Sequence, residues 1–128
     1  MSKPIPPLDL MWLIMETQAS PTHVGALLLF EKPKGNPAVV RQIVDAYRSF
    51  EPTPPFNYVP LVGGASLPHF REATSYDPCY HIQHIALPGG ATYDDLLRLV
   101  ADLHEPMLDR CRPLFRDWII DGVPDNLF

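Results

Sequence analysis

The sequence predicts an α/β fold, with helices lying on a sheet, and three observations point to it. Segments with helical and with strand-like patterns alternate along the 128 residues. Hydrophobic residues make up 46% of the chain, enough for an ordinary globular core. The 16 prolines separate these segments and form no repeat. A chain of this length fits one domain at most.

The first predicted elements are a helix over residues 7–18 and a strand over residues 24–30. Four apolar side chains in the helix recur at the spacing of one face: Leu8, Met11, Trp12 and Met15. Residues 24–30 read Val-Gly-Ala-Leu-Leu-Leu-Phe and are bounded by prolines. A continuous apolar run of this length is typical of a strand buried on both faces.

The second helix is predicted to start at Asn36-Pro37, an N-cap residue followed by proline at the first helical position, and to end near Phe50. Its apolar face consists of Val40, Ile43, Val44 and Tyr47. Residues 51–78 are rich in proline, glycine and polar side chains, which predicts a long loop with a short strand near 58–62. Long loops inside a domain are often functional.

The second half repeats the strand–helix–strand order. Residues 80–87 predict a strand, and Thr92 is placed to cap a helix with Asp94 and Asp95 in its first turn. The expected buried face of this helix is Tyr93, Leu96, Leu97, Val100 and Leu103. Residues 114–120 predict another strand and residues 124–126 a turn. Leu127-Phe128 then reads as the first step of a strand, so we expect a chain truncated within a longer domain.

Charge and hydropathy exclude several functions. The net charge is −5 and no basic run occurs, so nucleic acid is not an expected partner. The same acidity argues against strong attraction to anionic lipid. The N-terminus has no apolar segment of signal-peptide length, and the longest apolar run, residues 24–30, is too short to span a bilayer. We therefore expect a cytoplasmic protein.

The histidines and cysteines form no metal-binding pattern, and no metal is expected. His81 and His84 fall three apart on a predicted strand, so they would point to opposite faces. His23, His69 and His104 are isolated in the sequence, which favours surface or capped histidines. Cys79 and Cys111 favour free thiols, with a disulfide left open.

One charged segment resists a simple interpretation. Residues 108–115, Leu-Asp-Arg-Cys-Arg-Pro-Leu-Phe, place two arginines and an aspartate before an apolar strand. A structural loop, with Asp109 capping and Arg112 ion-paired, and a direct functional role are equally compatible with this pattern.

Five blocks of the sequence resemble, in order, motifs of the bacterial wax ester synthase/diacylglycerol acyltransferase family. The blocks are Pro7-Leu8-Asp9 with Glu16, Thr22-His23-Val24-Gly25, Pro54-Pro55-Phe56, residues 80–88 and residues 108–115. Thr22 replaces a methionine of the family pattern, Met107 replaces a proline, and Phe115 replaces a tryptophan. Phenylalanine keeps the aromatic ring but lacks the indole N–H donor.

This resemblance implies a partial N-terminal acyltransferase domain over residues 1–128. The fold would be the N-terminal portion of a chloramphenicol acetyltransferase-like, CoA-dependent acyltransferase fold, a mixed sheet with flanking helices. The activity would be transfer of a fatty acyl group from acyl-CoA to diacylglycerol or a long-chain alcohol. Acyl-CoA would be a co-substrate, with no cofactor. Substrate insolubility implies peripheral contact with a membrane or lipid droplet.

The resemblance also says where the chemistry lies. The family's catalytic motif, H-H-x-x-x-D-G, is expected beyond Phe128, so no catalytic residue is expected in this chain. Its second histidine would act as general base on the acceptor alcohol. The residues that match family motifs receive structural or tunnel-lining roles: Pro7, Asp9, His23, Gly25, Leu108, Asp109, Arg112, Pro113, Leu114 and Phe115. The apolar helices and the 51–78 loop would form core and acyl-binding wall.

Two alternatives remain open from sequence. The chain could be a non-catalytic module that binds acyl-CoA or lipid, or an unrelated α/β protein with chance similarity.

Overall fold

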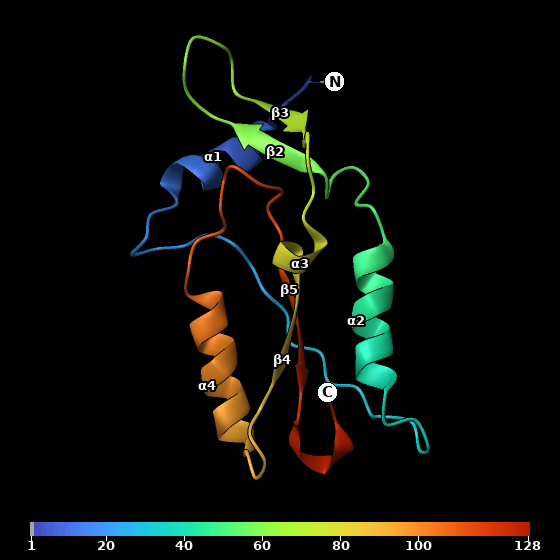
Figure 1. The fold of residues 1–128 in the computed structure, drawn as a ribbon. Coiled ribbons are helices and arrows are strands. Elements are labelled where there is room, and N and C mark those ends of the chain that lie inside the picture. The colour runs from blue at the N-terminus through green and yellow to red at the C-terminus, as the bar shows by residue number, and fades with distance from the viewer. Residues whose placement is uncertain (1) are drawn as a thin grey trace. The chain divides into compact units, whose positions relative to one another are not determined.

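A computed structural model describes residues 2–128, which divide into two compact units. The first contains residues 2–24, Glu51–Tyr76 and Pro106–Phe115. The second contains Gly25–Phe50, Asp77–Glu105 and Arg116–Phe128. Each unit is therefore assembled from three separate stretches of the chain, which Figure 1 traces by colour.

The first unit is built on a small antiparallel sheet. Its strands are β1 (Ser2–Pro4), β2 (Tyr58–Leu61) and β3 (His69–Glu72), in the order β1-β3-β2. The central strand β3 pairs with both others, and His69 lies opposite Pro4 on one side and Leu61 on the other. The predicted strand near 58–62 is confirmed, but the rest of residues 51–78 is not a plain loop. β1 and β3 were not predicted, because their short, mostly polar sequences show no alternation of apolar and polar residues.

Helix α1 (Pro7–Met15) starts at the predicted residue and ends three residues before Gln18. Proline at its first position costs no hydrogen bond, because that amide has no partner in a helix. The expectation that its apolar stripe is buried is wrong for the described residues, since no side chain of α1 is buried. Spacing along a helix determines which side chains share a face, but not whether another element covers that face.

The second unit contains β4 (Ile82–Ala86) and β5 (Asp117–Asp121), which pair in parallel with Ile82 opposite Asp117. Helices α2 (Val39–Ser49) and α4 (Tyr93–His104) flank this pair on either side (Figure 1). The core on the α4 side is formed by Leu96, Ile120 and Val123. This helix–strand alternation confirms the predicted α/β class.

The start of α4 is as predicted. The Thr92 hydroxyl accepts a hydrogen bond from the amide of Asp95, and the Asp95 carboxylate accepts one from the amide of Thr92, which is a complete capping box. The expected buried face is partly wrong. Leu96 is buried and Val100 and Leu103 are half-buried, whereas Tyr93 and Leu97 are exposed.

Helix α2 begins later than predicted, at Val39 with Ala38 as N-cap. Asn36 instead accepts a hydrogen bond from the Ala38 amide at 3.2 Å and so forms the turn that precedes the helix. Val40 and Val44 are buried as expected, while Tyr47 is exposed.

Two strand predictions shift. Tyr80 and His81 belong to the short helix α3 (Pro78–His81), capped by Asp77, and β4 follows it. β5 begins at Asp117 rather than Leu114. The predicted turn at 124–126 is confirmed as the 3₁₀ helix η1 (Pro124–Asn126).

The prediction of a buried strand over residues 24–30 is wrong. Within residues 2–128 the segment belongs to neither sheet, and Leu27, Leu28, Leu29 and Phe30 are 41–67% exposed. Its end is paired through two hydrogen bonds between the backbones of Phe30 and Phe128. A strand needs a neighbour for its backbone groups, and the apolar run by itself does not supply one.

Candidate functional site

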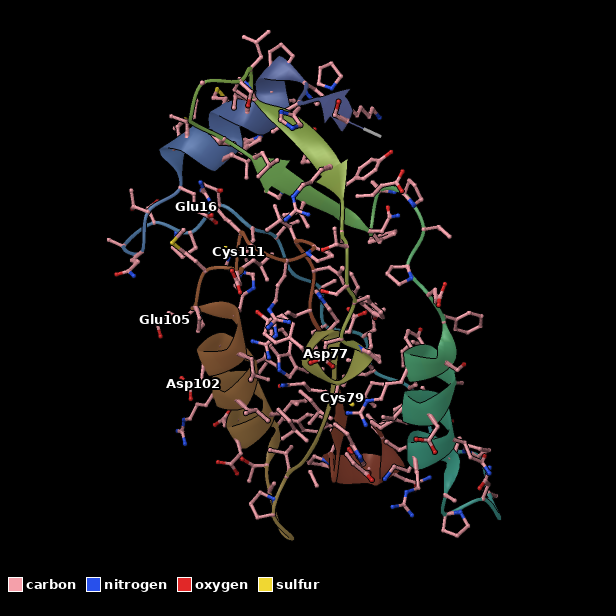
Figure 2. The ribbon with its side chains drawn as sticks, turned by 45° about the horizontal axis from the view of Figure 1, so that its top comes forward. Glu16, Asp77, Cys79, Asp102, Glu105 and Cys111 are labelled. Carbon is pink, nitrogen blue, oxygen red and sulfur yellow. The ribbon has the colours of Figure 1, made fainter. Side chains whose placement is uncertain are left out.

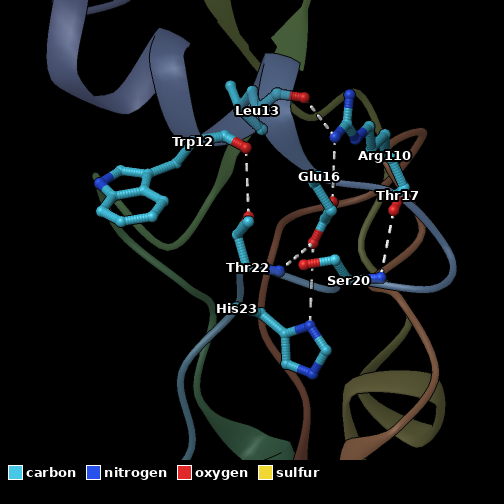
Figure 3. A network of polar contacts seen from close by, with 8 residues as sticks. All are labelled: Trp12, Leu13, Glu16, Thr17, Ser20, Thr22, His23 and Arg110. Atoms are coloured by element: carbon cyan, nitrogen blue, oxygen red, sulfur yellow. Dashed lines mark hydrogen bonds and ion pairs between the residues drawn. The ribbon is translucent and has the colours of Figure 1, made fainter.

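The first unit contains a polar network centred on the Glu16 carboxylate (Figure 3). Glu16 directly follows α1, and its side chain is 7% exposed. The Arg110 guanidinium donates to Glu16 Oε2 at 3.0 Å and also to the Leu13 carbonyl oxygen. The Thr22 amide donates to Glu16 Oε1 at 3.2 Å. One carboxylate thus ties the end of α1 to a following loop and to the 106–115 segment.

Opposing effects act on the pKa of Glu16. Burial raises this pKa, but the hydrogen bonds from Arg110 and from the Thr22 amide, together with the positive charge of Arg110, outweigh burial. The net pKa lies below the ordinary value, so Glu16 is a stable carboxylate at neutral pH. This charge suits holding an arginine rather than moving a proton.

His23 and Thr22 belong to this network, and the His23 side chain is 11% exposed, which corrects the expectation of a lone surface histidine. His23 Nδ1 lies 3.8 Å from Glu16 Oε1, within range of an ion pair when the imidazole is protonated. The Thr22 hydroxyl donates to the Trp12 carbonyl oxygen at 3.2 Å. Threonine, which here replaces the family's methionine, therefore supplies a hydrogen bond at the C-terminal end of α1.

The 108–115 segment folds into a tight turn, as its structural interpretation predicts. The Asp109 carboxylate accepts a hydrogen bond from the Cys111 amide at 2.9 Å, and the Asp109 carbonyl accepts one from the Arg112 amide. Arg112 Nε lies 3.4 Å from Asp109 Oδ2, with both side chains 43% exposed. Pro113 is buried and Leu108 half-buried. Asp109 and Arg112 thus shape this loop locally.

A cavity of about 310 Å³ in the same unit brings three of the family blocks together. It is lined by Lys3, Pro6, Asp9, Pro55, Phe56, Tyr58, Phe70, Leu114 and Phe115. The Phe115 ring meets Phe56 edge-on at 5.8 Å and stacks on Tyr76 at 6.3 Å. Of the predicted site residues, Asp9, Leu114 and Phe115 therefore line one aromatic cavity.

The remaining predicted residues do not line it. Pro7 is the first residue of α1, His23 belongs to the Glu16 network, and Leu108, Asp109, Arg112 and Pro113 form the turn. Gly25 lies in the second unit, where a Cβ atom would stand 2.9 Å from Nδ1 of His104. Glycine at this position permits the imidazole to pack against the backbone.

His81 and His84 do not share one strand. His81 ends α3 and is 1% exposed, whereas His84 lies exposed on β4. Burial raises the pKa of Asp117, and the nearby His81 offsets part of this increase. Within residues 2–128 no cluster of three or more His, Cys, Asp or Glu side chains could hold a metal ion. Cys79 and Cys111, both labelled in Figure 2, are exposed free thiols.

Sequence reasoning missed the Glu16–Arg110 pair. Both residues stood within motif blocks, but 94 positions separate them, and no periodicity links residues at that distance. Two clues were present: a carboxylate directly after a helix and an arginine flanked by a cysteine in a proline-rich turn.

The structure matches the wax ester synthase/diacylglycerol acyltransferase from Marinobacter aquaeolei VT8 with a TM-score of 0.89 and 34% sequence identity, over 98% of this chain and 31% of that one. The chain therefore has the fold of a portion of a CoA-dependent acyltransferase, as predicted.

The sequence comparisons agree. Residues 5–128 match the model of the wax ester synthase/diacylglycerol acyltransferase catalytic domain. A protein of Mycobacterium tuberculosis named as a diacylglycerol O-acyltransferase is 38% identical over 98% of this chain, and a second is 35% identical over 93%. The chain belongs to the wax ester synthase/diacylglycerol acyltransferase family. Chance similarity, one of the two alternatives, is therefore wrong.

The chain spans between 25% and 31% of the length of these relatives. Across residues 2–128, no helix has the length and apolar character needed to cross a membrane.

Proposed function

We propose that the protein, at the length of its relatives, transfers a fatty acyl group from acyl-CoA to diacylglycerol or to a long-chain alcohol. The observation that carries the proposal is the family match over residues 5–128. Relatives named as diacylglycerol O-acyltransferases and as a wax ester synthase support both acceptors. Acyl-CoA serves as co-substrate, and the reaction needs no further cofactor.

The proposed chemistry uses the H-H-x-x-x-D-G motif, which residues 1–128 do not contain. Its second histidine takes the proton from the acceptor hydroxyl while the oxygen attacks the thioester carbonyl. The carbon–sulfur bond then breaks, the ester forms, and the proton passes to the leaving CoA sulfur. None of the five histidines in this chain has that motif around it.

Residues 1–128 would contribute the scaffold and part of the acyl-binding surface. The aromatic cavity at Asp9, Leu114 and Phe115 supports a tunnel-lining role, because apolar pockets of a few hundred Å³ are typical of ligand sites. The turn containing Asp109 and Arg112 would brace the strand that leads to the catalytic motif. Because the acceptors are insoluble in water, the protein would act at the surface of a membrane or lipid droplet.

The test is an acyl-transfer assay on the chain continued beyond Phe128 as its gene encodes it. Palmitoyl-CoA is supplied with dioleoylglycerol or hexadecanol, free CoA thiol is measured, and the product is identified by chromatography. We expect turnover that disappears when the second histidine of the motif is replaced by alanine. Absence of the motif from the continued chain, or of product with both acceptors, would contradict the proposal.

A second candidate is a non-catalytic module that binds acyl-CoA or lipid. The observation that favours it is the aromatic cavity lined by Asp9, Leu114 and Phe115. Calorimetric titration of palmitoyl-CoA into the 128-residue chain helps to separate the module from the acyltransferase. Binding that is weakened by Phe115→Ala, without turnover in any longer form, would favour the module.

A further inference from the structure

The aromatic cavity of the first unit has an apolar inner part and a charged rim. The four half-buried residues of its lining are all apolar or aromatic: Tyr58, Phe70, Leu114 and Phe115. The two charged residues of the lining, Lys3 and Asp9, are exposed. Burial therefore sorts the lining by polarity. Such a cavity suits the apolar end of a molecule whose polar part stays near water.

The small antiparallel sheet supplies one wall of the cavity. Lys3 on β1 lies directly opposite Phe70 on β3, so their side chains leave the sheet on the same face. Tyr58 on β2 lies opposite Glu72, two residues along β3 from Phe70, and therefore shares that face. The rings of Tyr58 and Phe70 stack with their centroids 5.9 Å apart. Because paired strands carry these rings, the wall is held in place by the backbone.

Phe115 belongs to a second wall and is held by two other rings. It meets Phe56 edge-on, with centroids 5.8 Å apart. Tyr76, which does not line the cavity, stacks on Phe115 with an angle of 23° between the ring planes. The Phe115 ring therefore loses an aromatic contact if it turns out of the cavity. Phe115 is half-buried whereas Phe56 is 60% exposed, so Phe115 stands at the inner end of this wall.

We propose that Phe115 determines the length of the alkyl chain that the cavity accepts, because the end of a substrate chain stops against its ring. The chain passes the charged rim, lies against Tyr58 and Phe70, and ends at Phe115. The inference rests on the proposed function, which supplies acyl-CoA and a long-chain acceptor as molecules with such chains. Phe115 acts here as a specificity-determining residue and takes no part in the chemistry.

Two substitutions change the cavity in opposite directions. Phe115→Ala removes the ring and opens the cavity toward Tyr76, so that a longer chain gains room. Phe115→Trp adds ring volume at the same place, so that the end of a long chain meets a clash. In a hydrophobic pocket, one methylene group gained or lost changes the relative rate by about tenfold or more. The preferred chain length should therefore rise in the first variant and fall in the second.

The test is a competition assay on the chain continued as its gene encodes it. Octanoyl-, dodecanoyl-, hexadecanoyl- and eicosanoyl-CoA are supplied in equal amounts with dioleoylglycerol, and the products are resolved by mass. A second series keeps palmitoyl-CoA constant and varies the alcohol from octanol to eicosanol. A shift in the first series assigns the cavity to the acyl chain, and a shift in the second assigns it to the acceptor chain. Either shift supports the proposal.

We expect the ratio of the longest to the next longer product to rise about tenfold in Phe115→Ala and to fall about tenfold in Phe115→Trp. The control is Phe50→Ala, which removes a ring of the same size that is 72% exposed and does not line the cavity. It should leave the ratio unchanged. Less total product with unchanged ratios in both Phe115 variants would overturn the proposal. A shift in the same direction in both variants would also overturn it.

Two measures keep the test independent of folding and of turnover. The product ratio is taken within one sample, so it does not depend on the folded fraction, and Phe115→Leu replaces the alanine variant if that variant does not fold. If the unsubstituted protein makes no product, the proposed function is contradicted, and calorimetric titration with the same four acyl-CoAs tests the cavity. A preference for longer chains in Phe115→Ala would then support the role of Phe115, and an unchanged preference would overturn it.

Discussion

At the scale of single residues, the Glu16 carboxylate organises the first unit. It receives hydrogen bonds from a side chain 94 positions away and from the backbone of Thr22, while its own side chain is almost fully buried. A buried charge is tolerated only when its hydrogen-bonding partners are in place. Removal of one partner of the Glu16–Arg110 pair should therefore cost more than removal of one partner of an exposed ion pair.

Replacement of Glu16 by glutamine tests this. Glu16→Gln keeps the shape but removes the charged acceptor for Arg110, and we expect a loss of about 1–3 kcal/mol in the free energy of unfolding. Urea denaturation followed by circular dichroism measures it. Arg98→Gln is the matched control. The Arg98 side chain, which pairs with Asp95, is 78% exposed, so its replacement should leave the urea midpoint unchanged. Equal effects of both substitutions would contradict the role of Glu16.

The pH dependence of stability follows from the same group. The folded-state pKa of Glu16 is below its ordinary value of 4.5, so its contribution is complete above that pH and is lost as pH falls through the folded pKa. We expect the stability difference between the natural protein and Glu16→Gln to shrink to within about 0.5 kcal/mol on acidification. A stability difference that stays constant from pH 7 to the lowest measurable pH would contradict this. The contributions of the other carboxylates are the same in both proteins and cancel in the difference.

Gly25 gives a second prediction at this scale. A methyl group there would stand 2.9 Å from the His104 ring, so Gly25→Ala forces the imidazole aside at a cost of about 1 kcal/mol. In a His104→Ala background, Gly25→Ala should cost much less stability than it does in the natural protein, because the imidazole that it would displace is absent. Thermal denaturation of the four proteins measures the coupling. Additive effects would show that the imidazole is not the reason for glycine.

At the scale of elements, α4 is the part of the fold that local sequence specifies best. Its capping box needs only Thr92 and Asp95, three residues apart, and its buried side chains recur at helical spacing. We expect Thr92→Ala to lower the free energy of unfolding by about 1 kcal/mol, because the Asp95 amide loses its acceptor. Thr92→Ser should restore it, since serine supplies the same hydroxyl. An equal loss in Thr92→Ser would point to the methyl group rather than to the cap.

The elements that were mispredicted share one cause. The 24–30 segment and α1 have clear apolar patterns, yet both are exposed in the described chain. β1 and β3 have no such pattern, yet they form ladders. Strand formation depends on a partner elsewhere in the chain, and burial depends on an element that covers the face, so neither follows from local composition.

At the scale of the whole molecule, each unit draws on three distant stretches of the sequence. The turn of residues 108–115 belongs to the first unit, and β5 in the second unit starts only two residues after Phe115. If this turn braces the chain, its loss would therefore change the position of the strands that follow it in the sequence. The turn's own ion pair is half-exposed and adds little to stability.

Arg112→Ala in the continued chain separates a bracing role of the turn from a contribution of its ion pair to stability. We expect acyl transfer to fall about tenfold while the free energy of unfolding changes by less than about 1 kcal/mol, because exposed ion pairs contribute little to stability. Turnover and urea denaturation are measured on the same preparation. Arg41→Ala, on the exposed face of α2, is the control. Unchanged stability together with unchanged turnover would contradict the bracing role.

The sequence by itself determined the family, the α/β class, and the position and cap of α4. Motif blocks and helical caps depend on residues that are close in the chain, so they can be recognised without coordinates. The sequence also named Asp9, Leu114 and Phe115 as site residues, without indicating that they line one cavity.

Only the tertiary structure decided the contacts between distant residues. It joined Glu16 to Arg110, placed His23 in their network, left residues 24–29 outside both sheets, and paired Phe30 with Phe128. The physical reason is that hydrogen bonding and burial are properties of pairs. A carboxylate or an apolar strand carries the capacity for a contact in its own sequence, but the fold alone supplies the partner.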